Sequence, residues 1–279
     1  MEINVGIIEN LKQKLNILDS IDILAITDTE AEIYENKMET LVINPINNDR
    51  FNFLNDTFII PIDSSVIAFK GSTKPNFQYI ESGEKVNQLM FGFYTHYKNG
   101  KHNKGLNTAH DALRQTRTQP VLRTFDNETK SFKIDGVIEF GNVHDNIHAA
   151  WCRETNQQYY ESKGCQVIMG YPQCEKRKRA EGQWKTFSNV IYSMNKQVWN
   201  YLLIPYRWLD LKNDVCIFGS KGEKVKKLQK FLKITQDGVF GKDTLLKVIE
   251  FQKKYNLVVD GVAGVNTFEM LCLTSFVKV

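Results

Sequence analysis

The stretch DGVFGKDT, at residues 237–244, returns as DGVAGVNT at residues 260–267. In each copy the glycines suit a tight turn, and an Asp or Asn followed by Thr suits the beginning of a helix. Apolar residues recur at helical spacing before the first copy and between the two copies, namely Val225, Leu228, Phe231, Leu232, Leu245, Val248, Ile249 and Tyr255. The repeat therefore predicts a module of three short helices on a common core.

Both turns, together with the FQK triplet at residues 251–253, resemble the three-helix peptidoglycan-binding domain that occurs on many cell-wall hydrolases. The resemblance covers roughly residues 214–273. It implies an all-α domain over residues 214–279 whose partner is peptidoglycan. The alternative is a small bundle that keeps this fold without binding the ligand, because a fold does not determine a function.

The preceding part of the chain, residues 1–205, is expected to form a separate domain rich in β-strands. β-branched residues are frequent over residues 57–68, where Pro61 and Asp63 interrupt the run and predict two short strands. Further strands are predicted at residues 88–97, 120–125 and 131–140, and helices at residues 5–18 and 187–203. The expected fold class is therefore α+β, with a mainly antiparallel β domain followed by the small three-helix bundle.

Composition and charge fit a folded chain that meets an anionic polymer. The formal net charge is +4, and the excess of basic residues lies after Asp210. Such a surface suits wall glycan or nucleic acid, although scattered lysines are also ordinary on a solvated helix face. No apolar run reaches the length of a membrane span, and the first residues lack the basic start and apolar run of a signal peptide. Action at the cell wall would then require delivery by lysis, injection or non-classical export.

The segment HDNIHAAWCRETNQQYYESKGCQ, at residues 144–166, concentrates histidine and cysteine in a polar stretch. Cys165 directly follows a glycine, a position that can present a thiolate beside backbone N–H groups. Acyl transfer through a thioester needs this combination of nucleophile and oxyanion donors, together with a base. His148 is the nearest candidate base. The chain holds five cysteines at irregular spacing, so at least one free thiol is expected.

The same segment resembles the catalytic signature of L,D-transpeptidases, in which a histidine in an I-H-G-like strand precedes a Ser-x-Gly-Cys turn. The resemblance implies that Cys165 is the nucleophile, that His148 is its base, and that Ser162 and Gly164 shape the turn. It implies no metal and no other cofactor. The substrate contacts and the third catalytic member stay open, because the chain departs from the pattern at Ala149, Lys163, Gln166 and Val167.

Two residues are candidates for binding substrate. Arg123 could pair with a carboxylate of a peptidoglycan stem peptide, because guanidinium and carboxylate groups form bidentate hydrogen bonds. A surface ion pair is the alternative for this residue. Gln166 is the second candidate, since it directly follows the nucleophile. His102, His110 and His144 are interpreted as structural or solvated residues.

Two other chemistries compete with the thiol mechanism. His144, His148 and Cys152 are four residues apart, so a helix would place them on one stripe able to hold zinc, as in a zinc-dependent peptidoglycan peptidase. This alternative ranks lower because no H-E-x-x-H motif supplies a base. Nucleic-acid binding rests only on the basic run KRKR at residues 176–179, which is weak evidence, and no nucleic-acid partner is expected.

Taken together, these patterns predict a peptidoglycan-modifying enzyme that its C-terminal module holds on the wall. Cysteine acyl transfer on stem peptides would give hydrolysis with water and a cross-link with an amine. The lack of an export signal favours an antibacterial, endolysin-like hydrolase, while the oligomeric state stays open. Two non-enzymatic alternatives remain, a structural protein anchored to the wall and a particle-associated component that uses the module for docking.

Overall fold

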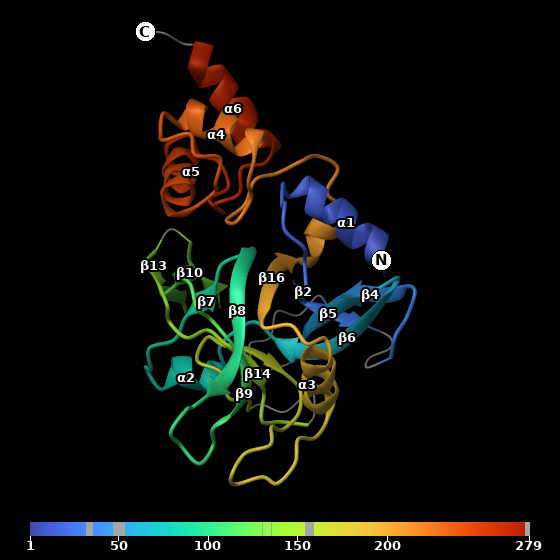
Figure 1. The fold of residues 1–279 in the computed structure, drawn as a ribbon. Coiled ribbons are helices and arrows are strands. Elements are labelled where there is room, and N and C mark those ends of the chain that lie inside the picture. Colours follow the sequence, from blue (N-terminus) through green and yellow to red (C-terminus); the bar gives the residue numbers. More distant parts are fainter. Residues whose placement is uncertain (32–35, 47–53, 130, 135, 154–158, 277–279) are drawn as a thin grey trace.

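The computed structural model describes residues 1–31, 36–46, 54–129, 131–134, 136–153 and 159–276. Within these ranges the chain is mixed α+β, with a β-rich N-terminal part and helices at the C-terminal end (Figure 1). None of the helices described is long and apolar enough to cross a membrane. The expected fold class is therefore confirmed at this level, and its details need two corrections.

The first correction concerns the sheet, which closes into an eight-stranded barrel in the order β14-β15-β6-β5-β2-β16-β8-β9. Most neighbours are antiparallel, but β14–β15 and β16–β2 are parallel. Closure leaves no free edge on which another strand could add. The barrel strands are β2 (Ile23–Thr27), β5 (Asp56–Ile62), β6 (Ser65–Ser72), β8 (Gly92–His102), β9 (His110–Arg114), β14 (Ile147–Ala149), β15 (Gln166–Ile168) and β16 (Val198–Pro205).

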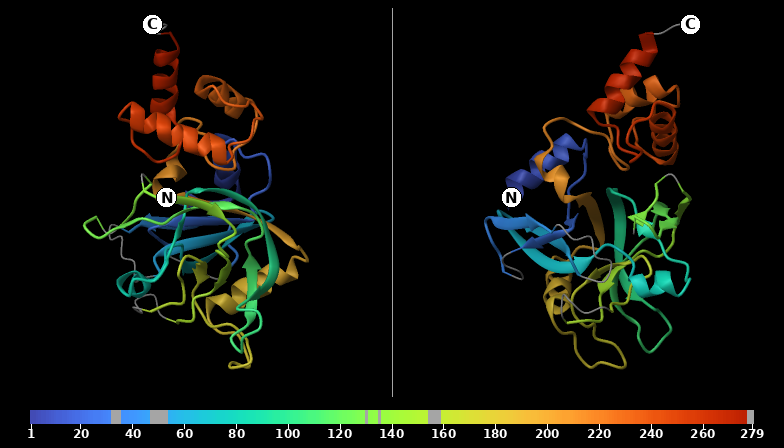
Figure 2. Two further views of the ribbon diagram at one scale, coloured as in Figure 1. Left: turned by 90° about the vertical axis from the view of Figure 1, so that its left-hand side faces the viewer. Right: turned by 180° about the vertical axis from the view of Figure 1, so that it is seen from behind.

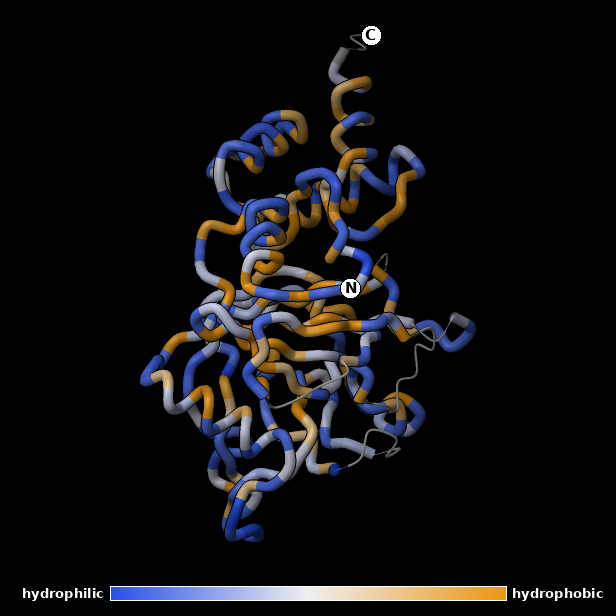
Figure 3. Tube along the Cα trace, turned by 90° about the vertical axis from the view of Figure 1, so that its right-hand side faces the viewer, coloured by the Kyte–Doolittle hydropathy of each residue, from blue (hydrophilic) through white to orange (hydrophobic). Residues whose placement is uncertain are grey.

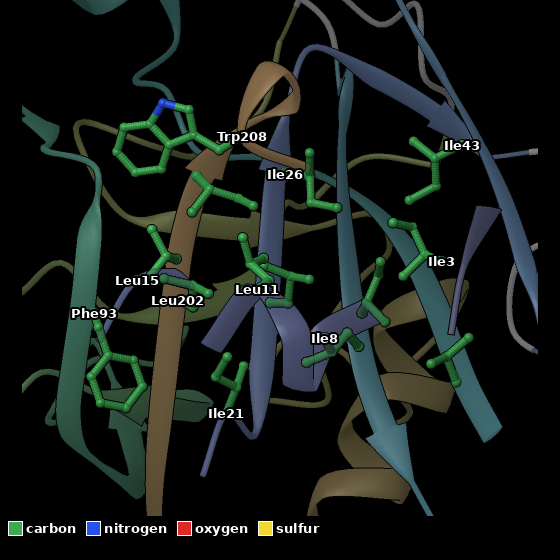
Figure 4. Close-up of a cluster of buried hydrophobic side chains, with 14 of the residues drawn as sticks. Ile3, Ile8, Leu11, Leu15, Ile21, Ile26, Ile43, Phe93, Leu202 and Trp208 are labelled. Carbon is green, nitrogen blue, oxygen red and sulfur yellow. The ribbon is translucent and has the colours of Figure 1, made fainter. Parts of the chain in front are cut away.

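At strand β2 both faces of the barrel wall are covered, which explains why this strand consists entirely of buried residues. Ile23 and Ala25 pack in the interior with aromatic rings such as Phe58 and Tyr201, whose centroids stack 6.4 Å apart. The alternate residues of β2 point outward and pack beneath α1 (Val5–Lys14). Figure 4 shows Ile8 and Leu11 of this helix beside Ile26 of β2 and Leu202 of β16.

Smaller elements surround the barrel. Strands β1 (Glu2–Ile3), β4 (Leu41–Pro45) and β3 (Thr29–Ala31) form one sheet, and β13 (Ile138–Gly141), β10 (Gln119–Leu122) and β7 (Gln88–Leu89) form a second. Strands β11 (Phe125–Asp126) and β12 (Ser131–Phe132) pair with each other. The remaining helices of this part are α2 (Phe77–Glu81), α3 (Gln183–Ser193) and the 3₁₀ helix η1 (Tyr206–Asp210).

The second correction concerns the helices. Three of the six α-helices described lie outside the C-terminal module, so the helical part of the protein is not one three-helix bundle. The helix expected over residues 187–203 ends with α3, because Asn195 adopts a positive φ of 49° and the following residues enter strand β16. In contrast, the two strands expected over residues 57–68 are confirmed as the β5–β6 hairpin, which turns at Asp63.

The C-terminal module consists of α4 (Glu223–Leu232), α5 (Lys242–Lys254) and α6 (Val265–Phe276). Its core gathers the apolar residues spaced at helical intervals, including Val225, Leu228, Leu245 and Val248. Figure 3 shows hydrophobic residues running through the centre of the barrel and alternating with hydrophilic residues along α6.

The module packs against one end of the barrel (Figures 1 and 2). Met90 and Leu122 belong to the same hydrophobic cluster as the module's helices. In the connector, the Phe93 backbone N–H donates to the Phe218 carbonyl at 2.8 Å, and the Val215 N–H donates to the Lys14 carbonyl at 2.8 Å. The barrel and the module therefore share a core cluster and backbone hydrogen bonds.

Candidate functional site

Cys165 and His148 come from two adjacent parallel strands. His148 is the central residue of β14, and Cys165 immediately precedes β15. Because alternate residues of a strand point to opposite faces, and Ile147 and Ala149 pack in the barrel interior, the His148 ring points outward. One ring nitrogen of His148, one of His102 and the Cys165 Sγ all lie within 4.8 Å of one another. The structure therefore brings the thiol and the candidate base together.

The turn before Cys165 is held by its own side chains. The Ser162 hydroxyl donates to the Cys165 carbonyl at 2.7 Å and accepts from the Gly164 N–H at 3.2 Å. Gly164 has a φ of +153°, and a Cβ at this position would lie 2.1 Å from the Asn87 Nδ2. A glycine is therefore required here both by the backbone conformation and by the close approach of Asn87.

A backbone carbonyl orients the His148 ring. The His148 Nδ1 lies 2.8 Å from the Ala149 carbonyl oxygen, so this nitrogen carries the proton and the Nε2 keeps its lone pair. The Cys165 Sγ donates to the His144 carbonyl at 3.3 Å. The group that orients His148 is a backbone oxygen. The sequence therefore could not reveal it as a third catalytic side chain.

The site favours the uncharged forms of both groups. Burial lowers the pKa of His148 well below its ordinary value, and the neighbouring His102 and His110 lower it further. Burial also raises the pKa of the Cys165 thiol, and Asp145 adds to this shift. The resting pair is therefore a thiol beside a neutral imidazole, and proton transfer has to accompany attack on a substrate.

Three histidine rings pack together beside the thiol. His102 stacks on His148 with ring centroids 4.0 Å apart and planes 16° apart, and His110 lies 5.3 Å from each ring. His102 and His110 are register partners at the end of the β8–β9 hairpin. Burial, first of all, lowers the pKa of His102 to about 4. The sequence interpretation did not include these two residues in the site, because nothing in the local pattern shows that the hairpin ends beside β14.

A chain of hydrogen-bonded polar side chains, Arg123, Asn87 and Asp145, packs against the turn that precedes Cys165. The Asn87 Nδ2 donates to both carboxylate oxygens of Asp145, at 2.8 and 2.6 Å, and the Asn87 backbone N–H donates to the Lys163 carbonyl at 3.0 Å. The Arg123 guanidinium donates to the Asn87 Oδ1 at 2.9 Å. Burial raises the pKa of Asp145 to about 8. Asn87 therefore connects the turn at residues 162–165 to the buried carboxyl group of Asp145.

The two predicted substrate contacts, Arg123 and Gln166, both have partners within the protein. Arg123 is only 12% exposed and pairs with Glu139 through its Nε at 2.8 Å, which is the ion pair expected as the alternative for this residue. Gln166 is fully buried, donates to the Gly164 carbonyl at 3.1 Å and accepts from the Tyr201 hydroxyl at 3.1 Å. Gln166 therefore holds the turn from the barrel interior.

The alternative zinc stripe of His144, His148 and Cys152 does not form, because His148 lies in a strand and not in a helix. Cys152 belongs to a buried cluster against which Cys165 also packs, and burial raises the pKa of the Cys152 thiol to about 12. The one group with metal-ligand spacing among the described residues is His102, His148 and Cys165. The lone pairs of the stacked His102 and His148 rings lie in two nearly parallel planes, so a cation in the plane of both rings would require one ring to rotate.

In the basic run at residues 176–179, two of the side chains have partners within the protein. The Arg177 guanidinium lies 4.0 Å from the centroid of the Tyr171 ring and 3.4 Å from a Glu181 carboxylate oxygen. Arg179 lies 3.9 Å from the same carboxylate group.

In the C-terminal module, the sequence repeat corresponds to a repeated hydrogen-bond network. The Gln229 Nε2 donates to Asp237 Oδ1 at 2.7 Å and to Thr244 Oγ1 at 3.0 Å. The Gln252 Nε2 makes the equivalent bonds to Asp260 and Thr267, at 2.8 and 3.4 Å. Each buried glutamine therefore fixes one copy of the turn onto the preceding helix. A groove of about 500 Å³ lies beside the first turn.

Comparison with known families gives one match, in this module. Residues 221–271 match the family model described as "Putative peptidoglycan binding domain". Neither the comparison with curated proteins nor the comparison with solved structures gives a match. The resemblance of the barrel to L,D-transpeptidases receives no support from a family model and stays a prediction. Residues 221–271 thus form a peptidoglycan-binding domain, which supports association of the protein with the cell wall.

Proposed function

We propose that the barrel modifies peptidoglycan stem peptides by cysteine acyl transfer while the C-terminal domain holds it on its substrate. One observation carries the proposal, namely that the Cys165 Sγ and a ring nitrogen of His148 lie within 4.8 Å of each other on the outer face of the barrel. The orientation of the His148 ring by Ala149 adds support, because it leaves the Nε2 free to accept a proton.

In the proposed reaction, the Cys165 sulfur attacks the carbonyl carbon of a peptide bond while His148 takes the thiol proton. Collapse of the tetrahedral intermediate breaks the C–N bond, and His148 returns the proton to the leaving amine. The resulting thioester is then attacked by water, which gives cleavage, or by an amine, which gives a cross-link. We favour cleavage, and with it an antibacterial, endolysin-like role at the cell wall.

The proposal is tested by incubating the full-length protein with purified sacculi and analysing the muropeptides that are released or changed. We expect the wild type to alter the muropeptide profile and Cys165→Ala to lose this effect by several orders of magnitude, because the covalent route is removed. Cys174→Ala is the matched control, since Cys174 is also a partly buried free thiol. Both variants should sediment with sacculi like the wild type.

The enzyme proposal would be contradicted if wild type and variants all sediment with sacculi but none of them changes the muropeptide profile. The protein would then be a non-catalytic wall-binding protein. A second candidate is a zinc-dependent peptidase, which the spacing of His102, His148 and Cys165 favours. The same preparations separate the two chemistries. One zinc per chain that is lost together with activity on treatment with EDTA would support the peptidase, whereas activity that survives EDTA supports the thiol mechanism.

A further inference from the structure

Arg114, the last residue of β9, borders the thiol site. Its Nη1 donates to the Lys101 carbonyl at 3.2 Å, and its Nη2 lies 3.5 Å from the His144 Nδ1. The carbonyl of the same His144 accepts from the Cys165 Sγ at 3.3 Å. One residue therefore lies between the guanidinium and the nucleophile, with its ring toward the first and its carbonyl toward the second.

The stem of Arg114 has a defined path across strand β8. A Cβ at Gly100 would lie 2.9 Å from the Arg114 Cδ and 3.1 Å from its Cγ. The absence of a side chain at Gly100 thus lets the arginine stem lie against the strand. This contact directs the guanidinium toward His144 and restricts the conformations that it can adopt. The positive charge of Arg114 also contributes to the lowered pKa of His102, after burial and His110.

The carboxylates in this region have other partners. Asp111 pairs with Lys101 at 2.6 Å, and Asp145 is buried beneath Asn87. Among the residues that the structure describes, none supplies a carboxylate to Arg114. Arg117 contacts a different histidine, because its Nη2 lies 3.1 Å from the His96 Nε2. Arg114 is thus a partly exposed cation beside a nucleophile, without an acidic partner in the described part of the chain.

We propose that Arg114 binds a free carboxylate of the acyl donor and thereby determines the substrate class of the site. Planar guanidinium groups recognise carboxylates through paired hydrogen bonds, which a lysine does not reproduce. The preferred donor is then a stem peptide with an unblocked carboxylate near the scissile carbonyl, and an amidated stem peptide is a poor donor. This inference rests on the proposed function, and its first test does not depend on turnover.

The first test compares two alkylating reagents that differ in charge, iodoacetate and iodoacetamide. In both reactions the Cys165 sulfur forms a bond to carbon, iodide leaves, and the thiol proton is released. The ratio of the two rates, followed by mass spectrometry of the peptide that contains Cys165, reports the attraction of an anion to the site. We expect Arg114→Gln to lower the iodoacetate-to-iodoacetamide ratio by about three- to tenfold at low ionic strength.

Two controls are built into this experiment. Arg117→Gln removes an equal charge from a side chain that contacts His96, and it should leave the ratio at Cys165 unchanged. Cys272 is a partly buried free thiol in the C-terminal module, so its ratio should stay the same in every variant. Arg114→Lys keeps the charge and an aliphatic stem, so the ratio at Cys165 should stay close to the wild-type value. An unchanged ratio at Cys165 in Arg114→Gln would overturn the proposal.

The second test uses stem peptides whose carboxylate is free or amidated. For the free acid, Arg114→Gln should raise KM about tenfold or more, because a charge-assisted hydrogen bond is lost. For the amide, KM should be the same in wild type and variant. Equal losses on both substrates would overturn the assignment of specificity. If Arg114→Gln changes the alkylation ratio but the wild type shows no turnover, the anion site is supported and the proposed function is rejected. Failure of the Arg114 proposal and failure of the proposed function are therefore distinguishable.

Discussion

At the scale of single residues, the protonation of the clustered histidines is the main electrostatic feature of the site. Burial lowers the pKa of His102 to about 4 and also lowers the pKa of His110 and His148. Two imidazolium rings would repel each other at a centroid distance of 4.0 Å, so the stack also disfavours protonation of both rings at once. The folded chain therefore binds fewer protons at these positions than the unfolded chain below about pH 6.5.

Stability rises with pH wherever the unfolded state binds more protons, so these histidines destabilise the fold as the pH falls below about 6.5. The variant His102→Phe keeps an aromatic ring in the stack and removes one titrating group. When the pH is lowered from 6.5 to about 5, the free energy of unfolding of this variant should rise by about 1–2 kcal/mol relative to that of wild type.

Denaturant unfolding of both proteins at the two pH values measures this difference. The raised pKa values of Asp56, about 6, and Asp145, about 8, make both carboxyl groups retain protons in the folded state, which acts in the opposite sense. These two groups are present in both proteins and cancel in the comparison. A difference that stays constant with pH would show that His102 is not held neutral by the fold.

At the scale of elements, the nucleophile turn depends on contacts with residues that lie far away in the sequence. Gly164 packs directly on Asn87, which is held in turn by Asp145 and Arg123. We expect Gly164→Ala to lower the free energy of unfolding by about 2–4 kcal/mol, because it combines an unfavourable φ with a steric clash. It should also abolish turnover, since the position of Cys165 depends on this turn.

Gly105→Ala is the matched control for this prediction. Gly105 also has a positive φ, of 93°, but a Cβ there would meet nothing within 4 Å. It should cost about 1–2 kcal/mol through the backbone conformation alone and leave turnover intact. Denaturant unfolding and muropeptide release on the same preparations measure both effects. Equal behaviour of the two variants would show that the contact with Asn87 does not position the nucleophile.

The predictable elements were those that local patterns specify. The β5–β6 hairpin and the three helices of the module follow from turn residues and apolar spacing over a few residues. Closure of the barrel was not predictable in this way, because parallel pairs such as β2 and β16 join residues that lie far apart in the chain. Within the site, the segment from His148 to Cys165 could be singled out from its motif. The contributions of His102, Asn87 and Arg114 could not, because they depend on this long-range pairing.

At the scale of the whole molecule, the connector fixes the peptidoglycan-binding domain to the barrel. Gly219 has a φ of +93°, and a Cβ at this position would lie 2.1 Å from the Phe93 carbonyl oxygen. Gly222, three residues later, has a similar φ of +109° but open space around it. These two glycines therefore separate the effect of the contact between the two parts from the effect of the backbone conformation.

We expect Gly219→Ala to lower the free energy of unfolding by about 1–3 kcal/mol more than Gly222→Ala, because only the former forces the connector away from β8. Thermal unfolding should show a single transition in wild type and in Gly222→Ala, and two separate transitions in Gly219→Ala. Indistinguishable unfolding curves for the two variants would show that the barrel and the domain do not depend on this contact.

The proposed thioester between Cys165 and a peptidoglycan stem peptide can be detected by mass spectrometry of acid-quenched protein. The full-length protein is mixed with stem peptide, quenched in acid during turnover, digested and analysed for acylated peptides. We expect an acyl group on the wild-type peptide that contains Cys165, and no such adduct in Cys165→Ala. Turnover of the wall substrate by wild-type protein that carries no acyl group at Cys165 would contradict it.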